Sequence, residues 1–167
     1  MLPQGVGREP VGPGQESVWD YPRPPALLPS TQHVQVVLGG QIVADTHASY
    51  RVLETSHPPT YYLPVEDFAA GALRASDGTS FCEWKGVAAY FDLVAGGRTE
   101  RRVAWGYPDP TPEYLALLDH VALYPGRVDR CTVDGEVVRA QPGNFYGGWV
   151  TSHVVGPFKG APGTMGW

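Results

Sequence analysis

Three glycine-containing turns, each between two runs of residues that favour β-strands, constrain the fold of this chain more than any other feature. The turns are Gly39–Gly40, Ala95–Gly97 and Asp134–Gly135. The flanking runs are HVQVVL and QIVAD, AAYFDLV and RTERRVAW, and VDRCTV and EVVRA. Gly-Gly and Asp-Gly tolerate the positive φ angles that tight hairpins require. The sequence therefore predicts three β-hairpins and a mainly β fold.

The rest of the body adds strands but little helix. The β-prone runs SYRVLE and TYYL lie on either side of HPP, whose prolines favour a loop or an edge. Residues 64–73 and 110–120 resemble helices, and the second has Thr111 as a candidate N-cap and Pro112 at the first helical position. We expect one or two short helices that only connect strands.

The two ends of the chain differ from its body. Residues 1–15 are rich in proline and glycine and have no periodic apolar pattern, which predicts a disordered or loosely attached segment. Residues 16–167 are expected to form a single domain, because a chain of this size can bury an independent core. Trp19 and Tyr21 are expected to pack back on this domain, and buried rings should order much of the C-terminal stretch.

Composition argues against several classes of function. A net charge of -5, without long acidic runs, disfavours an extended surface for nucleic acid or for an anionic membrane. Cys82 and Cys131 are not part of any CxxC, HExxH or Cys/His cluster, so we expect neither a metal site nor another cofactor. Phosphate-loop, GxGxxG and GxSxG motifs are missing.

The location and assembly of the protein are less constrained. The sequence shows no signal peptide and no apolar run near the roughly 20 residues that cross a bilayer. We therefore expect a cytoplasmic protein with free thiols. Its oligomeric state is left open.

The heptapeptide SFCEWKG is the best candidate for one wall of a functional site. In a regular strand, Cys82 and Trp84 point to one face while Glu83 and Lys85 point to the other. Cys82 and Lys85 converge only if Gly86 marks a bulge or a bend. In the alternative, Cys82 and Trp84 are buried, and Glu83 and Lys85 form a solvated pair.

The segment LETSHPPTYY is a second candidate. A turn at its prolines could bring Glu54, Tyr61 and Tyr62 around one cavity mouth, with Lys85 or an arginine as the partner of Glu54. Alternatively, the two tyrosines straddle a sheet, one on each face. His57 has no visible partner in the sequence, which slightly favours a structural role for it.

The segment AWGYPDP is a third candidate. Trp105 and Tyr107 have the same parity on an extended chain and would form one aromatic face. Such a face suits a flat ligand. Core packing is the commoner alternative.

Several ordered motifs resemble one family. RVLETSHPPTYYLPVEDF, SFCEWKG, AYFDLV, AWGYPDPTP, DHVALYPGRVD and VDGEVVRAQPGNFYGGW are similar to an uncharacterised bacterial and fungal family, domain of unknown function 427 (DUF427). The resemblance spans roughly His33 to Arg139, and the flanks are similar to those of longer actinobacterial members. It implies two antiparallel sheets packed in a β-tent (Mss4-like) arrangement over a cleft. Zinc and reductase activity, known in other β-tent proteins, are not implied, because the paired CxxC motifs are missing.

Three hypotheses of function follow. The leading one is a module that binds a small, flat or anionic molecule in the cleft between the sheets, through Glu54, Tyr61, Tyr62, Cys82, Trp84, Lys85, Trp105 and Tyr107. The second is an enzyme with Cys82 as nucleophile or Lys85 as charge stabiliser. A nucleotidyltransferase label is attached to the family in places, but the sequence lacks a Gly-Ser motif followed by an Asp-x-Asp pair. The third is an interaction domain that uses the aromatic N-terminal segment.

Overall fold

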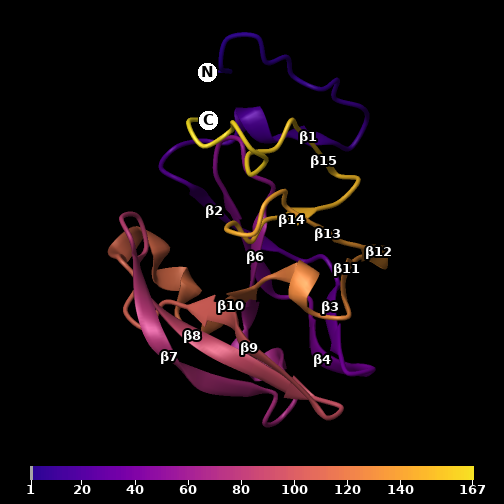
Figure 1. Ribbon diagram of the computed structural model, residues 1–167, viewed down its shortest axis with the longest axis vertical. Coiled ribbons are helices and arrows are strands. Elements are labelled where there is room, and N and C mark those ends of the chain that lie inside the picture. The colour runs from indigo at the N-terminus through magenta and orange to yellow at the C-terminus, as the bar shows by residue number, and fades with distance from the viewer. Residues whose placement is uncertain (1) are drawn as a thin grey trace.

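Short strands make up most of the computed structural model, which describes residues 2–167 (Figure 1). The strands are β1 (Glu16–Ser17), β2 (Ala26–Ser30), β3 (Val34–Leu38), β4 (Gln41–Thr46), β5 (Ser49–Leu53), β6 (Thr60–Pro64), β7 (Leu73–Cys82), β8 (Gly86–Ala95), β9 (Arg98–Gly106), β10 (His120–Leu123), β11 (Arg130–Val133), β12 (Glu136–Val137), β13 (Arg139–Ala140), β14 (Trp149–Val150) and β15 (Val154–Val155). The 3₁₀ helices are η1 (Val18–Asp20), η2 (Val65–Asp67), η3 (Pro112–Leu117) and η4 (Pro125–Arg127).

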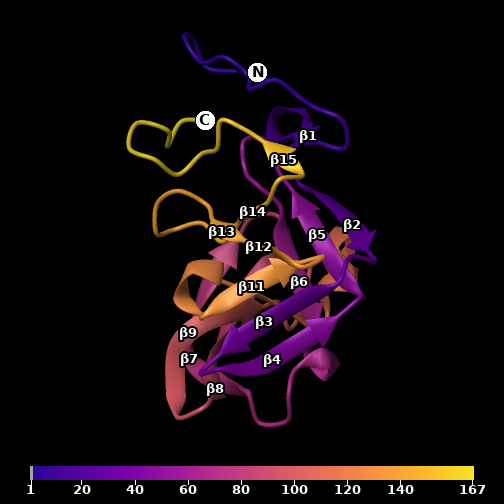
Figure 2. The same ribbon diagram turned by 90° about the vertical axis from the view of Figure 1, so that its right-hand side faces the viewer.

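Two antiparallel sheets form the body of the molecule. The larger sheet has seven strands in the order β2-β5-β6-β10-β9-β8-β7, and the smaller has four in the order β12-β11-β3-β4. The long hairpin of β7 and β8 lies at one side in Figure 1, and Figure 2 shows the smaller sheet in front of the larger one. Two further pairs, β1-β15 and β13-β14, join the flanks of the chain. The predicted mainly β fold is confirmed.

All three predicted hairpins are present. They are β3-β4, β8-β9 and β11-β12, each an antiparallel pair joined by its glycine turn. Gly39 and Gly40 have φ angles of 60° and 74°, and Gly96 and Gly97 have 56° and 75°. The first two turns also lie against each other so closely that a Cβ atom on Gly39 would collide with the main chain of Ala95. The three hairpins were therefore predictable from short stretches of sequence, namely each glycine turn and the β-prone runs beside it.

The two predicted helices are short 3₁₀ helices, of three and six residues. They are η2 and η3, and Pro112 begins η3 as expected. Thr111 stands at the N-cap position but does not cap the helix, because its hydroxyl donates to the main-chain oxygen of Trp84 at 2.6 Å. Among residues 2–167 no helix has the length and apolar character that crossing a membrane requires.

An apolar core fills the space between the two main sheets. Val36 on β3 and Cys131 on β11 are fully buried there, together with Leu63 and Leu123 from the larger sheet. Tyr61 belongs to this core, and its hydroxyl donates to Gln32 at 2.8 Å. The expected cleft between the sheets is thus occupied by side chains, and a ligand site has to lie elsewhere.

The flanks of the chain meet at one end of the molecule, where both termini lie (Figures 1 and 2). Trp19 and Tyr21 are buried there as predicted, so neither ring offers an exposed surface to a partner. Glu9 exchanges hydrogen bonds with Gly156, at 2.6 Å and 3.1 Å. The loose attachment of residues 1–15 stays a prediction. Met1, the first residue of this segment, lies outside the described residues.

Candidate functional site

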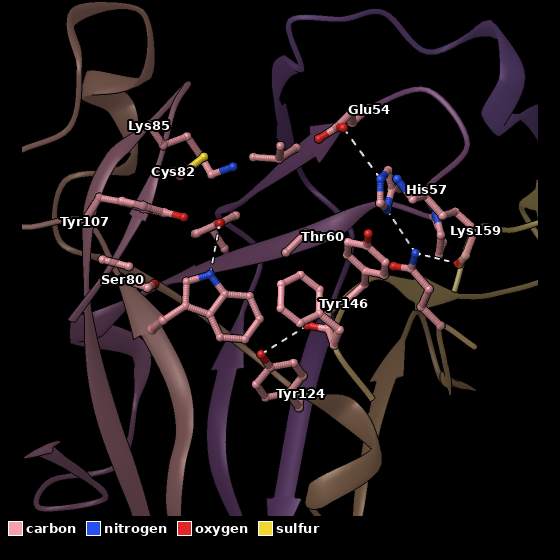
Figure 3. Close-up of a pocket in the computed structure, with 18 of the residues that line it drawn as sticks. Glu54, His57, Thr60, Ser80, Cys82, Lys85, Tyr107, Tyr124, Tyr146 and Lys159 are labelled. Atoms are coloured by element: carbon pink, nitrogen blue, oxygen red, sulfur yellow. Dashed lines mark hydrogen bonds and ion pairs between the residues drawn. The ribbon is translucent and has the colours of Figure 1, made fainter. Parts of the chain in front are cut away.

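A cavity of about 360 Å³ opens on the face of the seven-stranded sheet that is turned away from the core (Figure 3). Side chains two positions apart line it, as strand geometry requires for one face. These pairs are Val52 and Glu54, Thr60 and Tyr62, Ser80 and Cys82, Ala88 and Tyr90, and Trp105 and Tyr107. Loop residues complete the wall: His57, Lys85, Tyr124, Gln141, Tyr146 and Lys159. We call this cavity the lysine pocket.

The SFCEWKG segment is a hairpin turn and not a continuous strand. β7 ends at Cys82, which pairs with Gly86 at the start of β8, so residues 83–85 form the turn. Gly86 has a φ angle of 109°, a conformation that side-chain-bearing residues rarely adopt. The turn brings Cys82 and Lys85 to the same pocket. In a regular strand they would point to opposite faces. The bend that convergence required is therefore present, as a three-residue hairpin turn and not as a bulge.

Six of the eight sequence-derived candidates line the lysine pocket: Glu54, Tyr62, Cys82, Lys85, Trp105 and Tyr107. Tyr61 does not, because it alternates with Tyr62 across the sheet and points into the core. Trp84 does not either, because the turn directs it to a separate cavity beside Pro24 and Pro25.

Lys85 was a predicted site residue, whereas Lys159 was not, although the scarcity of lysine in the sequence was a signal for both. The chain contains only two, Lys85 and Lys159, against ten arginines. Both line the lysine pocket, Lys85 beside Cys82 on one side and Lys159 near His57 on the other (Figure 3). Lysine and arginine are not interchangeable as binding groups, since lysine carries a compact point charge. Both lysines of the chain thus line one cavity.

Aromatic rings form the floor of the pocket. The indole nitrogen of Trp105 donates to the Tyr62 hydroxyl at 3.3 Å, and the rings of Trp105 and Tyr124 lie 4.7 Å apart. Burial raises the pKa of Tyr62 and of Tyr107, so both stay neutral phenols. Gly147 packs on Trp105 so closely that no Cβ would fit. The floor is therefore aromatic, closely packed and uncharged.

Lys85 is a buried cation without an acidic partner. It is 9% exposed, and its Nζ atom lies 5.6 Å from the centre of the Tyr107 ring. Within residues 2–167 no carboxylate lies within 4.0 Å of this nitrogen. Burial opposes the charged form, but the interactions of the ammonium group with Tyr62 and Cys82 outweigh it and raise the pKa of Lys85. The side chain is therefore an ammonium group at neutral pH.

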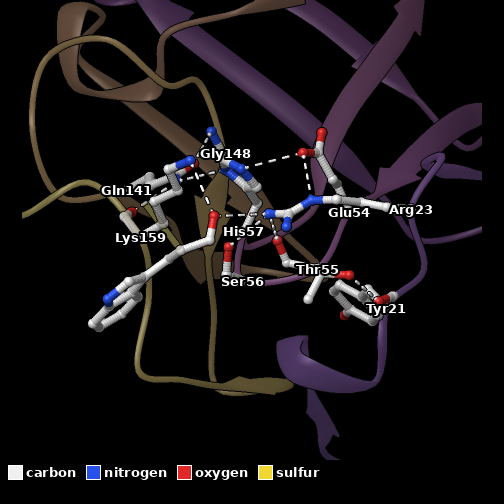
Figure 4. Close-up of polar contacts among 10 residues, drawn as sticks. Tyr21, Arg23, Glu54, Thr55, Ser56, His57, Gln141, Gly148 and Lys159 are labelled. Atoms are coloured by element: carbon white, nitrogen blue, oxygen red, sulfur yellow. Dashed lines mark hydrogen bonds and ion pairs between the residues drawn. The ribbon is translucent and has the colours of Figure 1, made fainter. Parts of the chain in front are cut away.

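Glu54, the only carboxylate in the pocket wall, is already engaged (Figure 4). Its Oε2 atom lies 3.3 Å from Arg23 Nε and 3.6 Å from His57 Nε2. The predicted partner of Glu54 was Lys85 or an arginine, and the structure selects Arg23. The negative charge of Glu54 is thus offset outside the pocket, and the two lysines leave the cavity positive.

Gln141 holds the wall of the pocket together and fixes the tautomer of His57 (Figure 4). It is 2% exposed, its Nε2 atom donates to the main-chain oxygen of Lys159 at 2.8 Å, and its Oε1 atom accepts from Gly148 N–H at 3.1 Å. These two bonds orient the amide, so the second Nε2 hydrogen is donated to His57 Nδ1 at 2.9 Å. His57 therefore carries its proton on Nε2, facing Glu54.

His57 should make the stability of the protein depend on pH. Burial, with the positive charges of Lys159 and Arg23, lowers its pKa from 6.5 to about 4 despite Glu54. The unfolded chain therefore takes up this proton first, and stability that is fully present above pH 6.5 is lost as the pH falls to 4. The loss is about 3 kcal/mol.

Urea unfolding of the wild type and of His57→Gln between pH 7.5 and pH 4 measures this effect. We expect the difference in unfolding free energy between them to shrink by that amount as the pH falls. His153→Gln, at an exposed position, is the matched control and should run parallel to the wild type. If the unfolding free energies of His57→Gln and the wild type changed with pH in the same way, His57 would not be a buried neutral imidazole.

A mainly β domain with an open, cationic and aromatic pocket is the class that fold and site define. Among residues 2–167 no three His, Cys, Asp or Glu side chains are grouped to hold a metal ion. Residues 26–134 match the model of the family described as domain of unknown function (DUF427), so the chain belongs to this family. The curated proteins contain no significant match.

Proposed function

We propose that this protein binds a small anionic molecule with a flat body in the lysine pocket. The observation that carries the proposal is Lys85, an ammonium group that is nine-tenths buried and lacks an acidic partner in the described residues. An unpaired buried charge is unfavourable, and a bound anion removes that cost. The ligand then supplies the countercharge that the chain does not.

The size and walls of the pocket support a small ligand. About 360 Å³ lies within the range of roughly 300–1,000 Å³ typical of small-molecule sites. Trp105, Tyr62 and Tyr107 offer ring faces for a flat body, while Lys85 and Lys159 hold its charge from two sides. The protein as a whole carries a net charge of -5, so attraction of an anion is local to this cavity.

Lysine NMR tests the proposal, because the chain's two lysines both report on the pocket. We would label the lysine ε-carbons with ¹³C and titrate the full chain with benzoate, a flat monoanion. Saturable shifts of both signals are expected, with benzamide as the neutral control. Signals that stay fixed at millimolar benzoate, in protein shown by native mass spectrometry to be ligand-free, would refute the proposal.

A second candidate function is an enzyme that uses Cys82, because the thiol shares the pocket with Lys85. An ammonium group beside a thiol stabilises a thiolate, the reactive form of cysteine. Covalent catalysis by Cys82 would keep the same ligand class, with an electrophilic carbon held over the sulfur.

Iodoacetamide tests whether Cys82 is accessible and reactive in the pocket, as the enzyme requires, and Cys131 is the internal control. Cys131 is fully buried, and burial raises its pKa, whereas Cys82 is partly exposed in the pocket. We expect one alkylated thiol per native chain, at Cys82, and protection of at least about tenfold in rate by saturating benzoate. Equal reactivity of both thiols would show that the native pocket does not control access.

We also propose that the two packed sheets belong to the β-tent group and that the protein is cytoplasmic. Two antiparallel sheets and two free thiols support these assignments. An experimental structure superposed on β-tent domains, and fractionation of the native cells, would test them.

A further inference from the structure

A second cavity, of about 600 Å³, adjoins the lysine pocket. We call it the arginine cavity. The two share Tyr90, Tyr124, Gln141 and Tyr146 as walls. At this shared wall the Tyr124 hydroxyl donates to the main-chain oxygen of Phe145 at 3.3 Å, which links the sheet to the loop above it. The two cavities are therefore direct neighbours on the same side of the molecule.

A β-bulge aims two arginines into the arginine cavity. Arg101 and Arg102 are neighbours on β9 and both line it, although successive residues of a regular strand point to opposite faces. Arg102 has a φ of 52°, and the pairing of β8 with β9 shifts register between Phe91 and Leu93. The Asp92 carboxylate accepts from Arg102 N–H at 2.8 Å and holds this conformation. Bulges that re-aim side chains are typical of functional sites.

The third arginine of the cavity supports the other two. Arg127 donates to the main-chain oxygens of Arg101 at 2.6 Å and Arg102 at 3.3 Å, and lies 3.5 Å from Glu100. Its charge is thus engaged in holding the bulge. The Arg102 guanidinium stacks 4.5 Å from the centre of the Tyr90 ring.

Arg101 and Arg102 themselves remain unpaired. Neither side chain has an acidic partner within 4.0 Å in the described part of the chain, and no Asp or Glu lines the arginine cavity. Two arginines that line one cavity without an acidic partner suit a phosphate group, to which arginine donates in a bidentate manner.

We propose that the arginine cavity is a phosphate subsite and that the natural ligand is a phosphorylated small molecule. Its flat anionic part lies in the lysine pocket and its phosphate group lies between Arg101 and Arg102. The proposal that one molecule spans both cavities rests on the proposed function, whereas phosphate binding at the arginines can be tested alone.

Inorganic pyrophosphate is the probe for the subsite. We would titrate it into the full chain and follow the arginine ¹⁵Nε signals, assigned from their loss in Arg101→Gln and Arg102→Gln. Saturable shifts of these two signals are expected. Each single substitution should weaken pyrophosphate at least about tenfold, the equivalent of one charge-assisted hydrogen bond.

Arg130→Gln is the matched control, because Arg130 is exposed on β11 and also loses one positive charge. It should change the affinity by less than twofold. An equal loss in this control, or no loss in the two cavity variants, would overturn the phosphate subsite. Binding of duplex DNA as tight as that of pyrophosphate would instead identify a nucleic-acid backbone as the partner, and would also overturn the proposal.

Adding benzoate to pyrophosphate separates this inference from the proposed function. Simultaneous saturation of the lysine and arginine signals is expected if the two cavities are distinct subsites. Competition between the probes would show a single anion site and refute a spanning ligand. Fixed lysine signals with shifted arginine signals would refute the lysine pocket and leave the phosphate subsite standing.

Discussion

Replacing Lys85 with methionine should abolish anion binding and, at the same time, make the unliganded protein more stable. Methionine is an unbranched side chain only one atom shorter than lysine, and it removes the charge of a residue that is 9% exposed and has no acidic partner in the described residues. We expect benzoate affinity to fall at least about 100-fold, because a buried charge pair is lost. The unfolding free energy should rise by about 1 kcal/mol, since the unpaired charge no longer has to be buried.

Thermal unfolding and titration of the same samples measure both effects. A gain of 1 kcal/mol corresponds to about 2–4 °C in Tm for a chain of this size. Lys159→Met is the control, because Lys159 Nζ already donates to the main-chain oxygen of Trp167 at 3.2 Å. It should weaken benzoate by about tenfold without stabilising the protein. A Lys85→Met protein that is less stable than the wild type would mean that the ammonium group has a structural role.

The hairpins and one face of the pocket were predictable because their signals are local. Glycine turns fix where β3 and β8 reverse, and alternation along a strand then decides which side chains share a face. That logic correctly grouped Trp105 with Tyr107. It also allowed for Tyr61 and Tyr62 on opposite faces, which is what the structure shows.

The turn at 83–85 escaped prediction because Glu-Trp-Lys contains none of the residues that normally mark a tight turn. Its reversal depends on Gly86 and on the bond from Thr111 to the Trp84 carbonyl, 27 residues away. The same limit applies to the Nδ1 side of His57, because only Glu54, which faces Nε2 at 3.6 Å, is close to it in sequence. Its partner, Gln141, lies 84 residues further along the chain, so only the folded structure brings them together.

Replacing Gln141 with leucine should destabilise the protein and dismantle the pocket wall. Leucine has a similar size but cannot replace the three bonds to Gly148 N–H, the Lys159 main-chain oxygen and His57 Nδ1. Leaving a buried polar group unsatisfied costs about 1–3 kcal/mol. We expect a loss of about 3 kcal/mol in unfolding free energy and of about 6–12 °C in Tm.

Gln35→Leu is the matched control for Gln141→Leu, because Gln35 makes one exposed bond to Asp45 at 3.0 Å. It should change the unfolding free energy by no more than about 0.5 kcal/mol. In Gln141→Leu protein that still folds, the pKa of His57 should be higher. The reason is that the Gln141 amide no longer donates to Nδ1, a bond that favours the neutral imidazole. NMR of the His57 ring measures that pKa directly. A Gln141→Leu protein as stable as Gln35→Leu, with an unchanged His57 pKa, would mean that the C-terminal loop is held by its rings and not by this amide.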